Sequence, residues 1–197
     1  MDQTILFIDG ENFIHKIEDI IKKHTKAKNS KVDLSSIDYN KLFQKPLEEY
    51  KITKKIFYAA KLHYYPETKE KSELLVKTQR KLRNTLLHQK FEFLIAGNVR
   101  GQKVTLDGKT KVIFKEKGVD VKLAVDLVSM AANKVLKTAI LCSSDSDLQP
   151  AIQEVRKRGV NVVYLGFEFQ PNKGLMYTTN STVVFRDLEI LKACGIK

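Results

Sequence analysis

Apolar and polar positions along the chain change period from segment to segment, which predicts alternating strands and helices. Residues 4–8 form a short apolar run that Asp9 and Gly10 close, as in a buried strand. From position 12 onward, apolar residues recur every three or four positions, as on the buried face of a helix. The same reasoning predicts further strands over 52–60, 91–96, 138–142, 160–165 and 182–185, and further helices over 38–50, 67–89, 119–133 and 145–157.

This alternation predicts an α/β fold in which a mainly parallel central sheet is flanked by helices on both faces. Residues 99–115 depart from it, because alternating segments flank an Asp107-Gly108 pair, the signature of a tight hairpin. We therefore expect one domain over residues 1–197 with a small β-hairpin insertion. In such sheets ligands bind beyond the carboxyl ends of the strands, where the strand order reverses.

Charge narrows the choice of partner. The 197 residues carry 35 Lys and Arg against 23 Asp and Glu, a net charge of +12. Such a domain attracts polyanions, chiefly nucleic acid, and an acidic substrate mimic or a calcium buffer is disfavoured. No apolar run reaches the ~20 residues of a membrane span, and the first residues lack the features of a secretory signal. Two cysteines are too few for a disulfide scaffold, so we expect a reducing cytoplasm.

Aspartates follow several of the predicted strands. Asp9 ends the first strand, Asp145 and Asp147 follow the strand at 138–142, and Asp120 opens the helix at 119. If the strand order is the usual 3-2-1-4-5, the strands at 4–8 and 138–142 are neighbours, with ends about 5 Å apart. Clustered carboxylates repel unless a cation neutralises them. Hard oxygen ligands suit Mg²⁺ or Mn²⁺, so the pattern predicts a metal site for phosphate chemistry.

Each aspartate also has a simpler explanation, because Asp is favoured at helix starts as an N-cap. Three separate termini that each carry an Asp favour the site over capping alone. Asp126 lies six residues after Asp120, about 240° around the helix, so the two cannot face one point. Asp126 is therefore expected to be a buried pairing partner behind the metal ligands.

Three stretches resemble, in order, the motifs of the NYN-domain family, specifically the LabA-like branch of the PIN-like ribonuclease superfamily. They are FIDGEN at 7–12, KGVDVKLAVDL at 117–127 and AILCSSDSDLQPAIQEVRKRGVNV at 139–162. With the connecting elements, the resemblance covers nearly the whole chain. It implies a PIN-like three-layer fold and a metal-dependent endoribonuclease that leaves a 5′-phosphate and a 3′-hydroxyl.

The resemblance also implies a set of site residues and a cofactor, Mg²⁺ or Mn²⁺. Asn12 closes the first motif and would orient water or phosphate. Ser144 stands where the family commonly has Gly, and residues 180–182 lack an acidic residue expected there. The implied metal ligands are Asp9, Asp120, Asp145 and Asp147.

Basic and aromatic residues flank the predicted crevice in sequence. His63-Tyr64-Tyr65 follows the second strand and could stack an unpaired base, or form a partly buried aromatic loop. Cys142 lies in a predicted buried strand without an adjacent His, which favours a core residue over a nucleophile. The candidates for RNA phosphate contacts are Lys61, Arg100, Lys103, Lys111, Lys115, Lys117 and Lys122.

The leading hypothesis is thus a metal-dependent ribonuclease. The alternative is a non-catalytic RNA-binding or regulatory module with a vestigial metal pocket. Both predict salt-sensitive RNA binding, so metal-dependent turnover separates them. A small-molecule phosphatase would normally place a second Asp two residues after the first, and Glu11 stands there instead. An adhesion site built on the SSDSD stretch fits the basic surface poorly.

Overall fold

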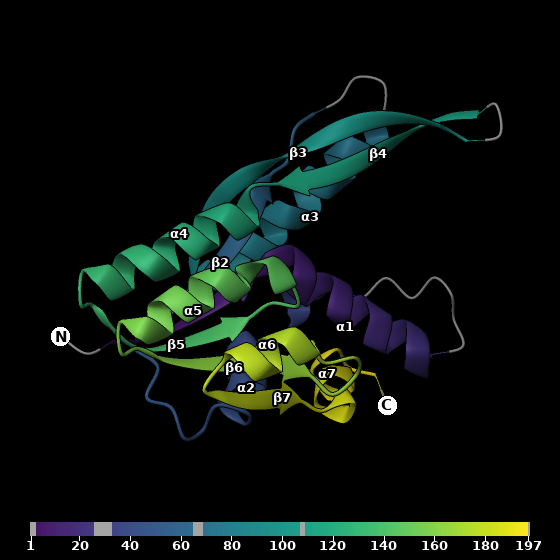
Figure 1. Ribbon diagram of the computed structural model, residues 1–197. Helices are drawn as coiled ribbons and strands as arrows, with labels where there is room; N and C mark the ends of the chain where they lie inside the picture. Colours follow the sequence, from purple (N-terminus) through teal and green to yellow (C-terminus); the bar gives the residue numbers. More distant parts are fainter. Residues whose placement is uncertain (1–2, 26–32, 65–68, 107–108, 197) are drawn as a thin grey trace.

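A curled seven-stranded sheet organises the computed structural model, which describes residues 3–25, 33–64, 69–106 and 109–196 (Figure 1). The strand order is β4-β3-β2-β1-β5-β6-β7, and all neighbours run parallel except β3 and β4. The predicted mainly parallel α/β sheet is confirmed. The strands are β1 (Gln3–Asp9), β2 (Lys54–Lys61), β3 (Glu92–Leu106), β4 (Lys109–Lys117), β5 (Leu136–Cys142), β6 (Asn161–Phe167) and β7 (Ser181–Phe185).

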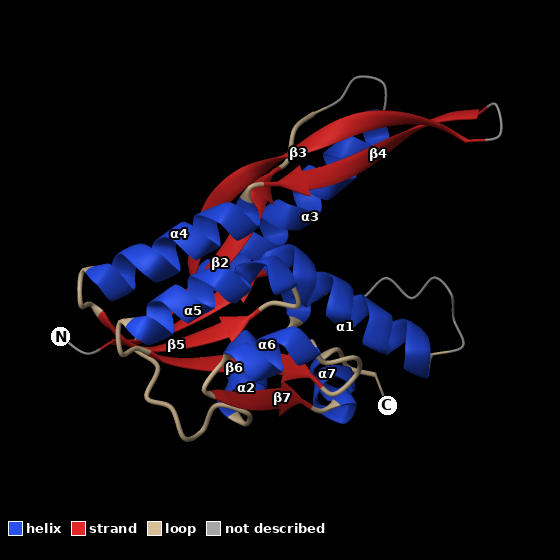
Figure 2. Cartoon of the chain, in the orientation of Figure 1, coloured by secondary structure: helices blue, strands red, loops and turns tan. Residues whose placement is uncertain are grey.

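Helices cover both faces of the sheet and complete the three layers (Figure 2). Helices α1, α2, α3 and α7 pack on one face, and α4, α5 and α6 pack on the other. Their bounds are α1 (Gly10–His24), α2 (Tyr39–Gln44), α3 (Lys69–His88), α4 (Val119–Ala132), α5 (Gln149–Lys157), α6 (Lys173–Thr178) and α7 (Asp187–Ala193). Among the described residues, no helix is long and apolar enough to span a bilayer.

The alternation of side chains along β1 decides which face receives its last residue. Leu6 and Ile8 pack in the core on the α1 side, whereas Ile5 and Phe7 pack in the core on the α4 side. Successive residues of a strand point to opposite faces. Asp9 therefore continues the row of Ile5 and Phe7 and lies at the carboxyl end of the central strand, on the α4 side.

Two predicted helices differ from those observed, and one observed helix was not predicted. The helix expected over 38–50 ends at Gln44, just before Pro46, which cannot continue a helix ladder. The helix expected from 145 begins only at Gln149, after a 3-10 turn, η3 (Ser146–Leu148). Helix α6, only six residues long, was not predicted at all.

Helical spacing predicts a buried stripe on α3, but the stripe is only partly buried; its residues are Leu74, Leu75, Thr78, Leu82, Thr85 and Leu86. Leu82 and Leu86 are buried, but Leu74 is 51% exposed. The first half of α3 runs beside the β3–β4 ribbon beyond the main sheet, as Figure 1 shows, so it has less core to cover. The stripe therefore holds only for the half of the helix that lies over the sheet.

The predicted hairpin is the outer part of two long strands. β3 first pairs with β2 in parallel and then continues as an antiparallel ribbon with β4, from Asn98 opposite Lys117 to Leu106 opposite Lys109. The ribbon projects from the body of the molecule (Figure 1). Its predicted turn, 107–108, lies outside the described residues. Because β4 leads directly into α4, the ribbon delivers the start of that helix to the carboxyl edge of the sheet.

Candidate active site

Asp9 is the centre of the site, a buried carboxylate at the end of β1 that is 3% exposed. It caps α1 by accepting from the Asn12 backbone N–H at 3.3 Å. The Asn12 side-chain amide donates to the same carboxylate at 2.6 Å, and the Ser143 hydroxyl donates to it at 3.0 Å. Three donors therefore fix the orientation of Asp9 before any ligand binds.

Strand pairing brings the second acidic segment beside Asp9. β1 and β5 are neighbours with Ile8 opposite Cys142, so Asp9 and Ser143 leave the sheet side by side. Asp145 then begins η3 and accepts from the Asp147 backbone N–H at 2.9 Å. Burial raises the pKa of Asp9, hydrogen bonds from Asn12 and Ser143 partly oppose this, and the charge of Asp145 raises the pKa further. The two carboxylates thus repel each other across the edge of the sheet.

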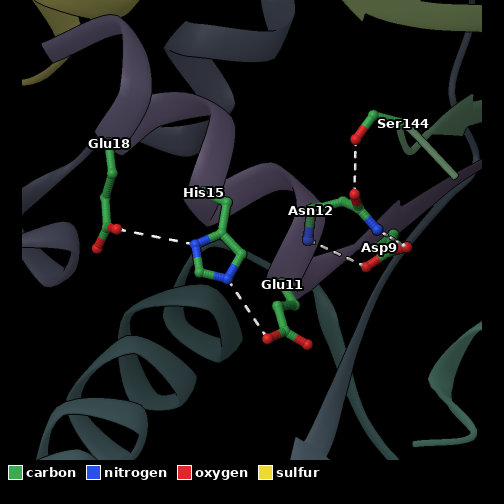
Figure 3. A network of polar contacts seen from close by, with 6 residues as sticks. All are labelled: Asp9, Glu11, Asn12, His15, Glu18 and Ser144. Carbon is green, nitrogen blue, oxygen red and sulfur yellow. Dashed lines mark hydrogen bonds and ion pairs between the residues drawn. The ribbon is translucent and has the colours of Figure 1, made fainter. Parts of the chain in front are cut away.

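The Ser143-Ser144 turn is tied to its surroundings on both sides. The Ser144 hydroxyl donates to the Asn12 side-chain oxygen at 2.6 Å (Figure 3). The Ser144 carbonyl accepts from the Asn172 side-chain amide at 2.8 Å, and Asn172 caps α6. The Ser144 hydroxyl therefore holds Asn12, which in turn holds Asp9.

Asp120 lies in the first turn of α4. The position of that turn is set by the close contact of Gly97 with Lys117 and Gly118. Gly118 precedes the helix with a φ of 91°, and a Cβ on Gly97 would lie 2.2 Å from the Lys117 carbonyl oxygen. Only glycine allows β3 and the β4–α4 junction to come this close. Asp120 is half-buried there, and its charge contributes to a raised pKa of Glu116.

Glu116 is an acidic residue of this site that sequence reasoning missed. Burial raises its pKa to about 9, and a hydrogen bond to Glu11 and the charges of Glu11, Asp9 and Asp120 add to the shift. The raised pKa favours the neutral carboxyl form of Glu116, which lies within electrostatic reach of three acidic residues. No spacing in the sequence points to it, because its place follows from the pairing of Glu116 with Val99 in the ribbon.

Glu11 also has partners that the sequence did not suggest. It hydrogen-bonds to Glu116, and His15 Nε2 lies 3.4 Å from its carboxylate. His15 Nδ1 lies 3.8 Å from Glu18, so the imidazole bridges two carboxylates of α1 (Figure 3). These hydrogen bonds, first to Glu11 and then to Glu18, raise the pKa of His15 to about 10. The imidazolium form thus persists at neutral pH.

Two other predicted residues differ from the buried Asp9 in their partners or their exposure. Asp126 is half-buried and accepts from the Tyr58 hydroxyl at 3.0 Å, and its other oxygen pairs with Lys122. Lys122, expected to contact RNA, is thus engaged by a carboxylate on its own helix. Asp147 has an exposed side chain. Its backbone N–H donates to Asp145, and its exposed side chain lies outside the buried part of the cluster.

The other basic and aromatic candidates are partly described. Lys61, Lys115 and Lys117 are exposed at the ends of β2 and β4. The side chains of Arg100, Lys103 and Lys111 lie outside the described residues, although their backbones pair in the ribbon. In the aromatic segment, Tyr64 is 50% exposed, His63 Nε2 lies 3.1 Å from the Asn98 side-chain oxygen, and Tyr65 lies outside the described residues. Cys142 is fully buried in the core.

The donor set decides whether the site suits a divalent cation. Among the described residues, no three Asp, Glu, His or Cys side chains lie together in a group that could hold a metal ion. The donor types nevertheless suit a divalent cation, because carboxylate oxygens are hard ligands and a cation would relieve the repulsion between neighbouring carboxylates. Asp9 and Asp145 are the pair for which this repulsion acts directly.

Comparison with known proteins assigns the chain to a family. The model of the NYN domain matches residues 3–186. The chain belongs to the NYN domain family. This NYN domain also resembles a solved structure of a protein of unknown function from Vibrio parahaemolyticus, with 16% identity, 93% of each chain covered and a TM-score of 0.59. That likeness concerns the fold alone, and a search of curated proteins finds no significant match.

Proposed function

We propose that this NYN domain is a metal-dependent ribonuclease of the LabA-like branch, acting in the cytoplasm on RNA. The observation that supports the proposal is that Asp9 and Asp145 follow the adjacent strands β1 and β5, close enough for the charge of Asp145 to raise the pKa of Asp9. Family membership supports the same reading, since NYN domains are grouped with PIN-like nucleases. The net charge of +12 supports a polyanionic substrate.

In this proposal, Asp9, Asp120 and Asp145 would hold Mg²⁺ or Mn²⁺, with Asp147 joining from the surface. The bound cation would polarise the phosphodiester and activate the attacking water. Asn12 and Ser143 hold the Asp9 carboxylate in place, and Ser144 holds Asn12. These side chains are thus preorganised, so substrate binding does not have to order them.

The surrounding cations would orient the RNA. Lys61 ends β2 beside Asn98, and Lys115 and Lys117 flank Glu116 on β4, so exposed positive charge borders the acidic crevice. We assign phosphate contacts to these three lysines and to Arg100, Lys103 and Lys111 on the ribbon. Lys122 can contribute only by leaving Asp126, its partner on α4. Phosphate contacts of this kind predict binding that weakens steeply with salt.

The test is cleavage of single-stranded and structured RNAs in Mg²⁺, Mn²⁺ or EDTA. Asp9→Asn and Asp145→Asn should each lower the metal-dependent rate by about a hundredfold or more, since a catalytic cation supplies several kcal/mol of stabilisation. RNA binding in EDTA should be retained or improved. Asp19→Asn is the matched control, because Asp19 is exposed on α1 and pairs only with Lys22 among its described partners.

Two outcomes would contradict the proposal. Undiminished cleavage by both site variants would exclude these carboxylates as metal ligands. Salt-sensitive RNA binding by the wild type, with no metal-dependent cleavage of any substrate, would instead support the non-catalytic RNA-binding module.

A further inference from the structure

A cavity of about 300 Å³ lies beside the acidic crevice, on the other face of the sheet. Helices α1 and α3 form its walls, and the ends of β2, β3 and β4 form its floor. Gly10 and Glu11, which directly follow Asp9, line its edge nearest the crevice. A group bound in this cavity would therefore lie close to a phosphodiester held at Asp9.

Most of the cavity lining is apolar. Phe57 and Phe93 stack on each other in the floor with ring centroids 5.6 Å apart, and Leu75 and Leu82 of α3 face them across the space. At ~30 Å³ for each water, the volume matches about ten waters. A nucleobase has about ten heavy atoms and two flat apolar faces, so it fits the size and the lining.

The polar groups at the rim are mainly oxygen acceptors. Glu11, Glu18 and Glu116 contribute the carboxyl oxygens that remain beside their contacts with His15 and with each other. Gln79 contributes an amide oxygen, because its amide nitrogen donates to the Ala60 carbonyl at 2.9 Å. His15 also lines the cavity, but Glu11 and Glu18 engage both of its nitrogens. A ligand that suits this rim must donate hydrogen bonds, as the exocyclic amino groups of cytosine, adenine and guanine do. Uracil lacks that group.

We propose that the cavity between α1 and α3 binds one unpaired nucleobase with an exocyclic amino group, next to the phosphate held at Asp9. This inference rests on the proposed RNA substrate and adds a base preference to it. In this arrangement the phosphate would face the exposed lysines, and the base would occupy the cavity that Leu75 and Phe93 help to line. Cleavage sites are then selected by a single nucleotide in unpaired RNA.

The experiment measures binding in EDTA, so that it does not depend on catalysis. The probes are fluorescently labelled oligouridylates of eight nucleotides whose central residue is uridine, cytidine, adenosine, guanosine or an abasic unit. For the wild type, a central base with an amino group should bind about tenfold more tightly than the abasic unit, as expected for one base that stacks and hydrogen-bonds. Uridine should fall between them.

Substitutions on α3 test whether this preference arises in the cavity. Leu75→Trp fills the cavity and should remove the base preference while keeping the salt-sensitive affinity for the abasic probe. Leu74→Trp is the matched control, because Leu74 is the adjacent residue, is 51% exposed and does not line the cavity. Thr78→Trp, at an exposed position of the cavity rim, is a second blocking variant if Leu75→Trp fails to fold.

The proposal is overturned if the wild type shows no base preference, or if both blocking variants retain it. Its failure can be distinguished from failure of the nuclease proposal. Metal-dependent cleavage that needs Asp9 without any base preference excludes the base pocket alone. A base preference that Leu75→Trp removes, without cleavage under any metal condition, excludes the nuclease and keeps the pocket.

Discussion

Replacement of Gly10 by alanine probes the point where the central strand turns into α1. A Cβ at this position would lie 2.4 Å from the Tyr58 carbonyl oxygen and 2.4 Å from Phe57 Cε1. Tyr58 belongs to β2, which pairs with β1 through Asp9, so its carbonyl cannot move without loosening the ladder. Helix α1 must therefore shift away from β2 by about 1 Å to restore an ordinary contact distance.

The magnitude follows from two opposing effects. Alanine gains up to ~1 kcal/mol over glycine in a helix, whereas overpacking in a closely packed region costs about 1–3 kcal/mol, occasionally more. Because one of the two clashing atoms is backbone, we expect the upper end of that cost and a net loss of about 2 kcal/mol in the free energy of unfolding. For a chain of this size, that lowers Tm by about 4–8 °C.

The assay combines thermal unfolding with the metal-dependent cleavage described above. A shift of about 1 Å in α1 displaces Asn12 relative to Asp9, and misplacement of this size costs about a hundredfold in rate. Gly174→Ala is the control, because the nearest atom to its added Cβ is the mobile end of the Gln149 side chain. If Gly10→Ala leaves Tm and cleavage as they are in Gly174→Ala, the close approach of α1 to β2 does not position the site.

Three further substitutions test separate contacts. Asp187→Ala removes a buried carboxylate that accepts from Lys23 and His24 at 2.9 Å each, so it should cost about 2 kcal/mol in denaturant unfolding, whereas loss of the exposed Lys22–Asp19 pair should cost under ~0.5 kcal/mol. The pKa of His15 is raised to about 10, so its bridge to Glu11 and Glu18 stabilises the fold fully below the unfolded pKa of 6.5 and is lost as pH rises toward about 10. The difference in Tm between the wild type and His15→Gln should therefore shrink over that pH range. Ser144→Ala should slow metal-dependent cleavage with little change in Tm. Cleavage at the wild-type rate would exclude the Ser144 hydroxyl as a positioning group.

Much of the fold could be predicted because its signals are local. The apolar runs that became β1 and β5 are continuous, and their parallel pairing follows from the helices between them. The adjacency of Asp9 to the SSDSD turn was therefore predictable from topology alone. The boundaries of α2 and α5 were not, because Pro46 and the 3-10 turn before Gln149 set them through local geometry.

The missed parts of the site depend on long-range register. In the sequence, Glu116 is one acidic residue among the lysines of a predicted strand. Its pairing with Val99 in the folded ribbon places it beside Glu11. The exposure of Leu74 likewise follows from how far α3 extends along the ribbon, which no helical pattern encodes. Asn172 secures the Ser144 carbonyl from a helix too short to give a periodic signal. Sequence motifs thus pointed to the aspartates and Asn12, but not to Glu116 or Asn172 around them.

In the ribbon of β3 and β4, the length of the projecting part is independent of the base, where the ribbon positions residues of the site. At its base, Asn98 pairs with Lys117 and Val99 pairs with Glu116, and the contact of Gly97 with Lys117 fixes that end. Matched residues added or removed at the far tip leave this base in register, so the arm can lengthen or shorten without moving the carboxylates. A single residue inserted between Glu116 and Gly118 would rotate the strand by half a period and turn Glu116 or the start of α4 away. The number of paired residues beyond the base of the ribbon is therefore not constrained by the site, whereas the spacing at the base is.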